Sequence, residues 1–249
     1  MLKKPLLLLA AGLLAFGNAY AEDEEPEKEF SLDGEVGLLF TTGNTETSSF
    51  KGRLASHHEM ESWSNDYVLE MLYKREEVDT EEGEQTQTSA QKIFFSGQGN
   101  YKLTNPDNRL FLFGSYEDDR FSGFEYQSTI AAGWNSKLWK NKNSRLAYSV
   151  GPGYAIARTM EGESRNGVIV RGAFDYKWKV SDSATFKQIV STEVGSENTK
   201  SRSETSISAQ VNGSMSLKFS IILNHNSNVE VGTEKLDTET TATLVYSFF

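Results

Sequence analysis

The most constraining feature of the chain is a repeated alternation of apolar and polar residues that begins at Phe30 and continues to the C-terminus. Successive side chains of a β-strand point to opposite faces, so each alternating segment is expected to form a strand with one apolar face. The clearest segment, 168–180, carries Val168, Val170, Gly172, Phe174, Tyr176, Trp178 and Val180 on one face and Arg171, Asp175, Lys177 and Lys179 on the other. The sequence therefore predicts an all-β fold.

About twelve such segments follow one another, and their connections alternate in length. Short turn sequences lie at 104–108, 140–144, 181–183 and Asn212-Gly213, and longer, more charged junctions lie at 76–85, 118–125, 159–167, 195–203 and 226–237. Asn-Gly is typical of a type I′ hairpin turn. An even strand number, with short turns on one side and longer loops on the other, is typical of bacterial outer-membrane barrels. We therefore predict a transmembrane up-and-down antiparallel β-barrel of about 12 strands.

One segment leaves its orientation open, because 108–119 is apolar on both faces. A secreted β-sandwich would also show alternating strands. Tyr and Trp near the expected strand ends favour the barrel, since aromatic girdles lie at both interfaces of a membrane. These residues are Trp63, Tyr73, Tyr101, Trp139, Tyr148, Trp178 and Tyr246.

The N-terminal region has a different composition. Lys3 and Lys4 precede the short apolar block Leu6–Gly17, and Ala19-Tyr20-Ala21 follows it. This order predicts a secretory signal peptide at 1–21, because the apolar block is too short to span a membrane. An acidic, disordered lead-in is expected at 22–29 and the barrel at 30–249. We therefore expect export through the secretory pathway and residence in the outer membrane of a Gram-negative bacterium.

Composition narrows the partners. The chain has no cysteine, which excludes disulfides and a lipoprotein anchor, and its net charge of −10 argues against a nucleic-acid partner. A mean hydropathy of −0.50 is compatible with a barrel, in which only alternate strand residues meet lipid. The expected surroundings are outer-membrane lipid and lipopolysaccharide.

Charged residues on the polar faces are the candidate site. We expect two groups to line the lumen: Glu35, Arg53, Glu70 and Lys92 on the early strands, and Arg171, Asp175, Lys187 and Glu193 on the later ones. Opposite charges on adjacent strands satisfy one another inside a narrow barrel, which is a purely structural interpretation. Alternatively, these charges line a small aqueous path and set its ion preference. A twelve-stranded barrel is intermediate in size between filled eight-stranded barrels and open porins, so barrel size does not decide whether the lumen conducts ions.

An enzyme is the alternative from another class. The three histidines, His57, His58 and His225, have no accompanying Gly-x-Ser-x-Gly motif, and their spacing matches no closed metal site. We therefore expect no catalytic, cofactor-binding or metal-binding residues and no enzymatic activity. A barrel hydrolase and a secreted β-sheet protein that binds a surface ligand stay open as alternatives.

Several stretches carry a family resemblance. Asp118–Tyr126, Ala132-Gly133-Trp134, Gly151–Tyr154, Asp237–Thr240 and Leu244–Phe248 resemble landmarks of the YdiY-like family. That family carries the label of a salt-induced outer membrane protein. The resemblance implies an outer-membrane barrel but no activity, so a narrow channel and a role in envelope or salt stress are both compatible with it.

The C-terminal segment suggests a further partner. Tyr246-x-Phe248 has the aromatic spacing with which outer-membrane barrels usually end, although Phe249 follows it. We expect the barrel assembly machinery to recognise this strand, and we expect the protein to be a monomer.

Overall fold

The computed structural model describes residues 29–41, 47–80, 83–119, 122–229 and 234–249. The predicted signal peptide and most of the acidic lead-in lie outside these residues. No helix in the described part is long and apolar enough to cross a membrane. The strands are β1 Phe30–Thr41, β2 Thr47–Glu59, β3 Trp63–Thr80, β4 Gly83–Lys102, β5 Asn108–Asp119, β6 Phe124–Lys140, β7 Ser144–Thr159, β8 Gly167–Lys179, β9 Ala184–Gly195, β10 Thr199–Gln210, β11 Met215–Asn226 and β12 Leu236–Ser247.

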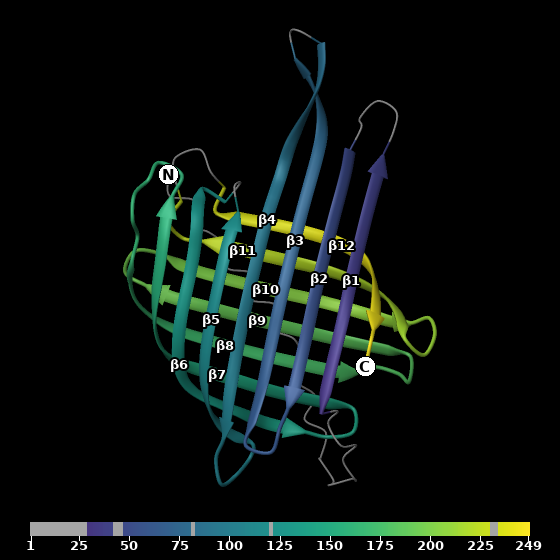
Figure 1. Cartoon of the computed structure of the whole chain (residues 1–249), viewed down its shortest axis with the longest axis vertical. Helices are drawn as coiled ribbons and strands as arrows, with labels where there is room; N and C mark the ends of the chain where they lie inside the picture. Colours follow the sequence, from purple (N-terminus) through teal and green to yellow (C-terminus); the bar gives the residue numbers. More distant parts are fainter. Residues whose placement is uncertain (1–28, 42–46, 81–82, 120–121, 230–233) are drawn as a thin grey trace, which may run out of the picture.

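The twelve strands form one closed barrel. Each strand pairs antiparallel with its neighbours in the chain, and β1 closes the barrel by pairing with β12, with Glu35 opposite Val245. Ser247 Oγ donates a hydrogen bond of 2.6 Å to Asp33 at this seam. In Figure 1, β1–β6 (purple to teal) run steeply through the front wall, and β8–β12 (green to yellow) cross behind them. The predicted all-β, twelve-stranded, up-and-down barrel is confirmed.

The two faces of the wall differ as the alternation predicts. On β8, Val168, Val170 and Phe174 are exposed on the outside, whereas Ile169 and Arg171 are buried inside. The same alternation continues around the barrel, so the outer surface is an apolar belt. A barrel of this kind is stable only where its outside meets an apolar solvent.

β5 resolves the orientation that its sequence left open. Leu110 and Leu112 face outward and are about half exposed, whereas Phe111 and Phe113 point inward and are buried. The two phenylalanines pack with Ala131 of β6 into an apolar cluster inside the barrel. Periodicity could not decide between these faces because both surroundings, lipid and cluster, are apolar.

β6 and β7 approach each other unusually closely inside the barrel. A Cβ added at Gly151 would lie 2.1 Å from the carbonyl oxygen of Ala132, and one at Gly133 would lie 2.3 Å from that of Val150. Only glycine fits at these two positions, since real Cβ atoms do not come so near a backbone oxygen.

The connections correct three local predictions. The turn between β10 and β11 spans four residues, and neither Asn212 nor Gly213 has a positive φ, so it is not type I′. Instead, Asn212 Oδ1 accepts hydrogen bonds from the backbone N–H groups of Ser214 and Met215. Most of the charged segment 76–85 continues β3 and β4 as strand, and this hairpin extends beyond its neighbours in Figure 1. The junction predicted at 195–203 shortens to three residues, because β10 begins at Thr199.

Aromatic side chains gather where the short turns lie. Trp63 and Tyr101 pack with ring centroids 5.1 Å apart, and Tyr246 packs edge-on against Phe248 at 4.8 Å. Trp139 and Trp178 lie near the same end of the barrel, and all of these side chains are exposed. This arrangement matches one of the two aromatic girdles of a membrane barrel.

Candidate functional site

Charged side chains fill much of the barrel interior. Each occupies a polar position of an alternating strand, so the pleat itself turns it away from the apolar outer surface. On β1, β2 and β3 the register places Glu35 opposite Arg53 and Arg53 opposite Glu70. The Arg53 guanidinium lies 3.8 Å from Glu35 and 3.6 Å from Glu70. Local strand pairing therefore sets two carboxylates on either side of one arginine.

The same side chains also reach the opposite wall. Arg53 Nη1 donates to Glu204 Oε1 of β10 at 2.9 Å, and Arg202 Nη2 of β10 donates to Glu70 at 3.0 Å. β10 pairs with β9 and β11, not with β2 or β3, so these contacts cross the lumen. They join residues that lie more than 130 positions apart in the chain.

Lys218 of β11 completes this cluster. Its Nζ lies 3.1 Å from Glu35 and 3.0 Å from Glu204, so it links β1 to β10. We call the six residues Glu35, Arg53, Glu70, Arg202, Glu204 and Lys218 the cross-lumen network. It holds three cations and three carboxylates, so its formal charges balance.

A second tier of charges lies nearer the end of the barrel with the β3–β4 hairpin. Lys51 contacts Glu239 of β12 at 3.1 Å, and Lys200 of β10 contacts Glu117 of β5 at 2.9 Å. Lys92 lies between them, 3.6 Å from Glu117 and 3.7 Å from Glu239. This outer tier again connects strands that are not neighbours in the sheet, so ion pairs cross the lumen at two levels.

The part of the interior between β5 and β9 is built differently. The Arg171 guanidinium stacks 3.7 Å above the centre of the Phe113 ring and lies 3.5 Å from Glu193. Thr129 donates to Glu193 at 2.8 Å. Here one charged pair is held against the apolar cluster.

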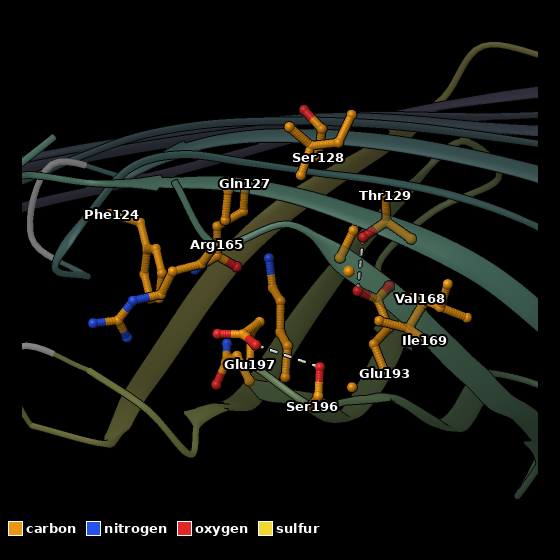
Figure 2. Close-up of a pocket in the computed structure, with 17 residues that line it drawn as sticks. Phe124, Gln127, Ser128, Thr129, Arg165, Val168, Ile169, Glu193, Ser196 and Glu197 are labelled. Carbon is orange, nitrogen blue, oxygen red and sulfur yellow. Dashed lines mark hydrogen bonds between the residues drawn. The ribbon is translucent and has the colours of Figure 1, made fainter. Parts of the chain in front are cut away.

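A small cavity is lined in part by Glu193 of this pair (Figure 2). It has a volume of about 40 Å³, with room for about two or three water molecules. Thr129, Glu193 and Gln127 line it, together with Lys200 and Arg165. Gln127 is buried, and its Nε2 has no hydrogen-bond partner within the described part of the chain. The residues that line the cavity therefore include both an unused amide donor, on Gln127, and the Glu193 carboxylate.

The structure locates each predicted lumen residue. Glu35, Arg53 and Glu70 lie in the cross-lumen network, and Lys92 lies in the outer tier. Arg171 and Glu193 form the pair beside Phe113.

Asp175 and Lys187 lie apart from these groups. They contact each other at 3.3 Å, and about a third of each side chain is exposed. Their strand positions are closer to the short-turn end of the barrel.

Sequence reasoning missed the partners on the opposite wall. Arg202, Glu204, Lys218, Glu117 and Glu239 were not selected, although each lies in the charged interior. The available signal was the spacing of Lys200, Arg202 and Glu204 at every second position of one segment.

The histidines do not gather at one place. His57 lies 2.7 Å from Asp66 and 3.3 Å from Glu59, near the β2–β3 turn, whereas His225 lies at the opposite end of the barrel on β11. Among the residues that the structure describes, no group of three or more metal-ligating side chains is arranged to hold a metal ion.

A closed twelve-stranded barrel with an apolar outside and a charged inside is the architecture of an outer-membrane β-barrel protein. Similar solved structures include the NanC porin, at 10% identity over 86% of this chain and 98% of that chain, with a TM-score of 0.50. An outer membrane channel from Pseudomonas putida F1 matches at 9% identity over 93% of this chain and 100% of that chain, also with a TM-score of 0.50. At such identities the likeness concerns the fold alone.

The chain belongs to the family described as "Protein of unknown function, DUF481", which matches residues 34–248. It is also 27% identical, over 254 aligned residues, to the "Uncharacterized protein YdiY" of Escherichia coli (strain K12). That alignment covers 97% of this chain and 96% of the relative. The resemblance to YdiY-like proteins is therefore confirmed.

Proposed function

We propose that the protein is a narrow outer-membrane channel for small ions, with the cross-lumen network as its constriction. The carrying observation is the set of ion pairs that join β1–β3 to β10 and β11 through the lumen, at 2.9–3.1 Å. The eight predicted lumen residues, Glu35, Arg53, Glu70, Lys92, Arg171, Asp175, Lys187 and Glu193, belong to this proposal as residues that set ion preference.

The energetic cost of buried charges supports an ion path through the lumen rather than charged side chains that only fill the interior. Burying a charge is costly even when it is paired, and apolar residues of similar size fill an interior more cheaply. Ionisable residues within membrane-spanning segments commonly mark pathways for ions or protons. A lumen crossed by ion pairs at two levels offers charges of both signs to a passing ion, so ion selectivity depends on which pairs open.

The proposal includes how the protein reaches its site. Residues 1–21 would direct secretory export, and the C-terminal strand around Tyr246 and Phe248 would engage the barrel assembly machinery. The apolar belt would then face lipid and lipopolysaccharide, with the protein acting as a monomer and without enzymatic activity.

A second candidate is a closed barrel with a structural role in the envelope, including under salt stress. The same short contacts favour it, because direct pairing of Arg53 with Glu204 narrows the cross-section where an ion would have to pass. The two candidates differ in one observable, conduction.

The test is single-channel recording of the refolded chain from residue 22 onward in a planar bilayer. The channel predicts discrete, salt-dependent openings whose ion selectivity changes in Glu70→Gln and in Arg171→Gln. It also predicts a larger unit conductance in the double variant Arg53→Ser/Glu204→Ser, because both crossing side chains are shortened.

Arg158→Gln is the matched control, since Arg158 and Glu125 form an exposed pair away from these charged groups. This variant should conduct like the unchanged chain. If the unchanged chain and the double variant both fold, as judged by heat-dependent gel mobility, yet neither conducts, the closed structural barrel is supported instead.

A further inference from the structure

The outer wall of the barrel contains a groove of about 520 Å³ over β3–β6. It is lined mainly by outward-facing residues and is far more apolar than the interior. We call it the outer-wall groove and define it by Tyr67, Phe95, Gly97, Leu112, Gly114 and Ile130.

Two glycines on adjacent strands make its floor. The register places Gly97 of β4 opposite Gly114 of β5, and Gly114 opposite Ile130 of β6. A Cβ added at Gly114 would have no atom within 4 Å, and one at Gly97 would touch only the Tyr67 ring, at 3.5 Å. Neighbouring strands therefore both lack a side chain at the same height of the wall.

The walls of the groove are large apolar side chains that the protein itself leaves uncovered. Leu112 is 57% exposed, Ile130 55% and Phe95 49%. Unfilled space beside such side chains forfeits dispersion contacts, which a flexible hydrocarbon can restore.

The depth of the groove selects its occupant. Gly114 is the seventh of the twelve residues of β5, and Gly97 lies midway between Lys92 and Lys102, the residues at which β4 begins and ends its pairing with β5. The groove is continuous with the apolar belt that meets lipid, and it lies at the level of the hydrocarbon rather than of the headgroups. Small residues at such a surface permit close approach of an apolar partner.

We propose that the outer-wall groove binds an acyl chain of a membrane phospholipid, as a specific site in the lipid-facing wall. The site has no charged residue in its lining, which fits a hydrocarbon chain rather than a headgroup. This proposal rests on the barrel architecture and is independent of whether the lumen conducts.

The test uses the full mature chain in nanodiscs of phosphatidylethanolamine that carries a photoactivatable diazirine in one acyl chain. After illumination, labelled residues are mapped by peptide mass spectrometry. Labelling of Leu112 and Ile130 should exceed that of Val170 and Phe174 several-fold. The latter pair are exposed lipid-facing residues on β8, which is separated from β6 at the edge of the groove by β7 and is not part of its lining.

Gly114→Leu should abolish this excess, because its side chain fills the groove from an open position. Gly114→Ala should reduce it less and covers the case in which the larger substitution fails to fold. Gly172→Leu is the matched control, since a Cβ at Gly172 also has no atom within 4 Å and faces lipid elsewhere. Equal labelling of the groove and β8, unchanged excess in Gly114→Leu, or cross-links between two copies of the chain at Leu112 would each overturn the proposal.

Discussion

Two parts of the barrel interior are filled by different kinds of side chain. Between β1–β3 and β10–β11, long charged side chains meet from opposite walls, as in the 2.9 Å contact of Arg53 with Glu204. Between β5 and β9, Phe111 and Phe113 pack with Ala131, and glycines let β6 and β7 come together. The charged pair of Arg171 and Glu193 lies against that cluster, with the Arg171 guanidinium over the Phe113 ring.

The difference teaches where flexibility can reside. An apolar cluster and a glycine contact have one close-packed arrangement, and a change of one methyl group is felt there. Ion pairs can exchange partners, and Arg53 already has three carboxylates within 4 Å. The charged half is therefore the part in which an ion path could open without rebuilding the wall.

The largest expected effect is in the charged half. Arg53→Met removes the cation shared by Glu35, Glu70 and Glu204 and should destabilise the barrel by about 3–5 kcal/mol, because the buried network is left with two cations for three carboxylates. Urea unfolding followed by tryptophan emission measures this cost. The double variant Arg53→Met/Glu204→Gln should recover much of it; a single variant as stable as the unchanged chain would show that water already compensates these charges.

The stability of the apolar part of the lumen, where Phe111 and Phe113 pack and β6 approaches β7, should be sensitive to a single added methyl group. Gly151→Ala places a Cβ 2.1 Å from the Ala132 carbonyl oxygen, which forces the backbones of β6 and β7 apart and should cost about 3 kcal/mol. The same unfolding experiment with Gly172→Ala is the control, since no atom lies within 4 Å of that position. Similar midpoints for the two variants would contradict the close approach.

The border between the halves tests stacking against charge. Arg171→Met should cost about 1–2 kcal/mol, because it removes the guanidinium above the Phe113 ring and the partner of Glu193. Arg171→Lys keeps the charge without the planar stack, and its unfolding midpoint should fall between those of Met and Arg. If Lys is no better than Met, the planar contact dominates; full recovery would assign the effect to charge alone and contradict the stacking.

The smallest effect should be outside both halves. Arg158 and Glu125 form a pair of 3.2 Å in which both side chains are about half exposed. Arg158→Gln should change stability by about 0–1 kcal/mol, since water screens such pairs. A loss comparable to that of Arg53→Met, in the same urea titration, would break the contrast between interior and surface pairs.

Much of the wall could be predicted because its signals are local. Val170 faces out and Arg171 faces in, as the alternation of 168–180 predicts, and the short turns at 104–108 and 140–144 lie where their Asn-rich sequences indicate. The Asn212-Gly213 turn type was wrong, since Asn212 is used as a cap to the following backbone N–H groups. The preference of Asn-Gly for a two-residue type I′ turn is overridden at this position by a four-residue turn.

The sequence by itself determined the barrel class, the strand number and the apolar belt. Alternation of apolar and polar residues is a local property of each strand and does not depend on which strands it contacts. Only the tertiary structure decided that Arg53 meets Glu204 and that Glu70 meets Arg202. Those partners lie on strands that do not pair with each other. Neither their spacing in the sequence nor the order of strands in the sheet could therefore predict these contacts. Closure of the barrel brings side chains from opposite walls close enough to form ion pairs. The inward orientation of Phe111 was also decided by the tertiary structure, because closure places Phe113 and Ala131 where Phe111 can pack with them.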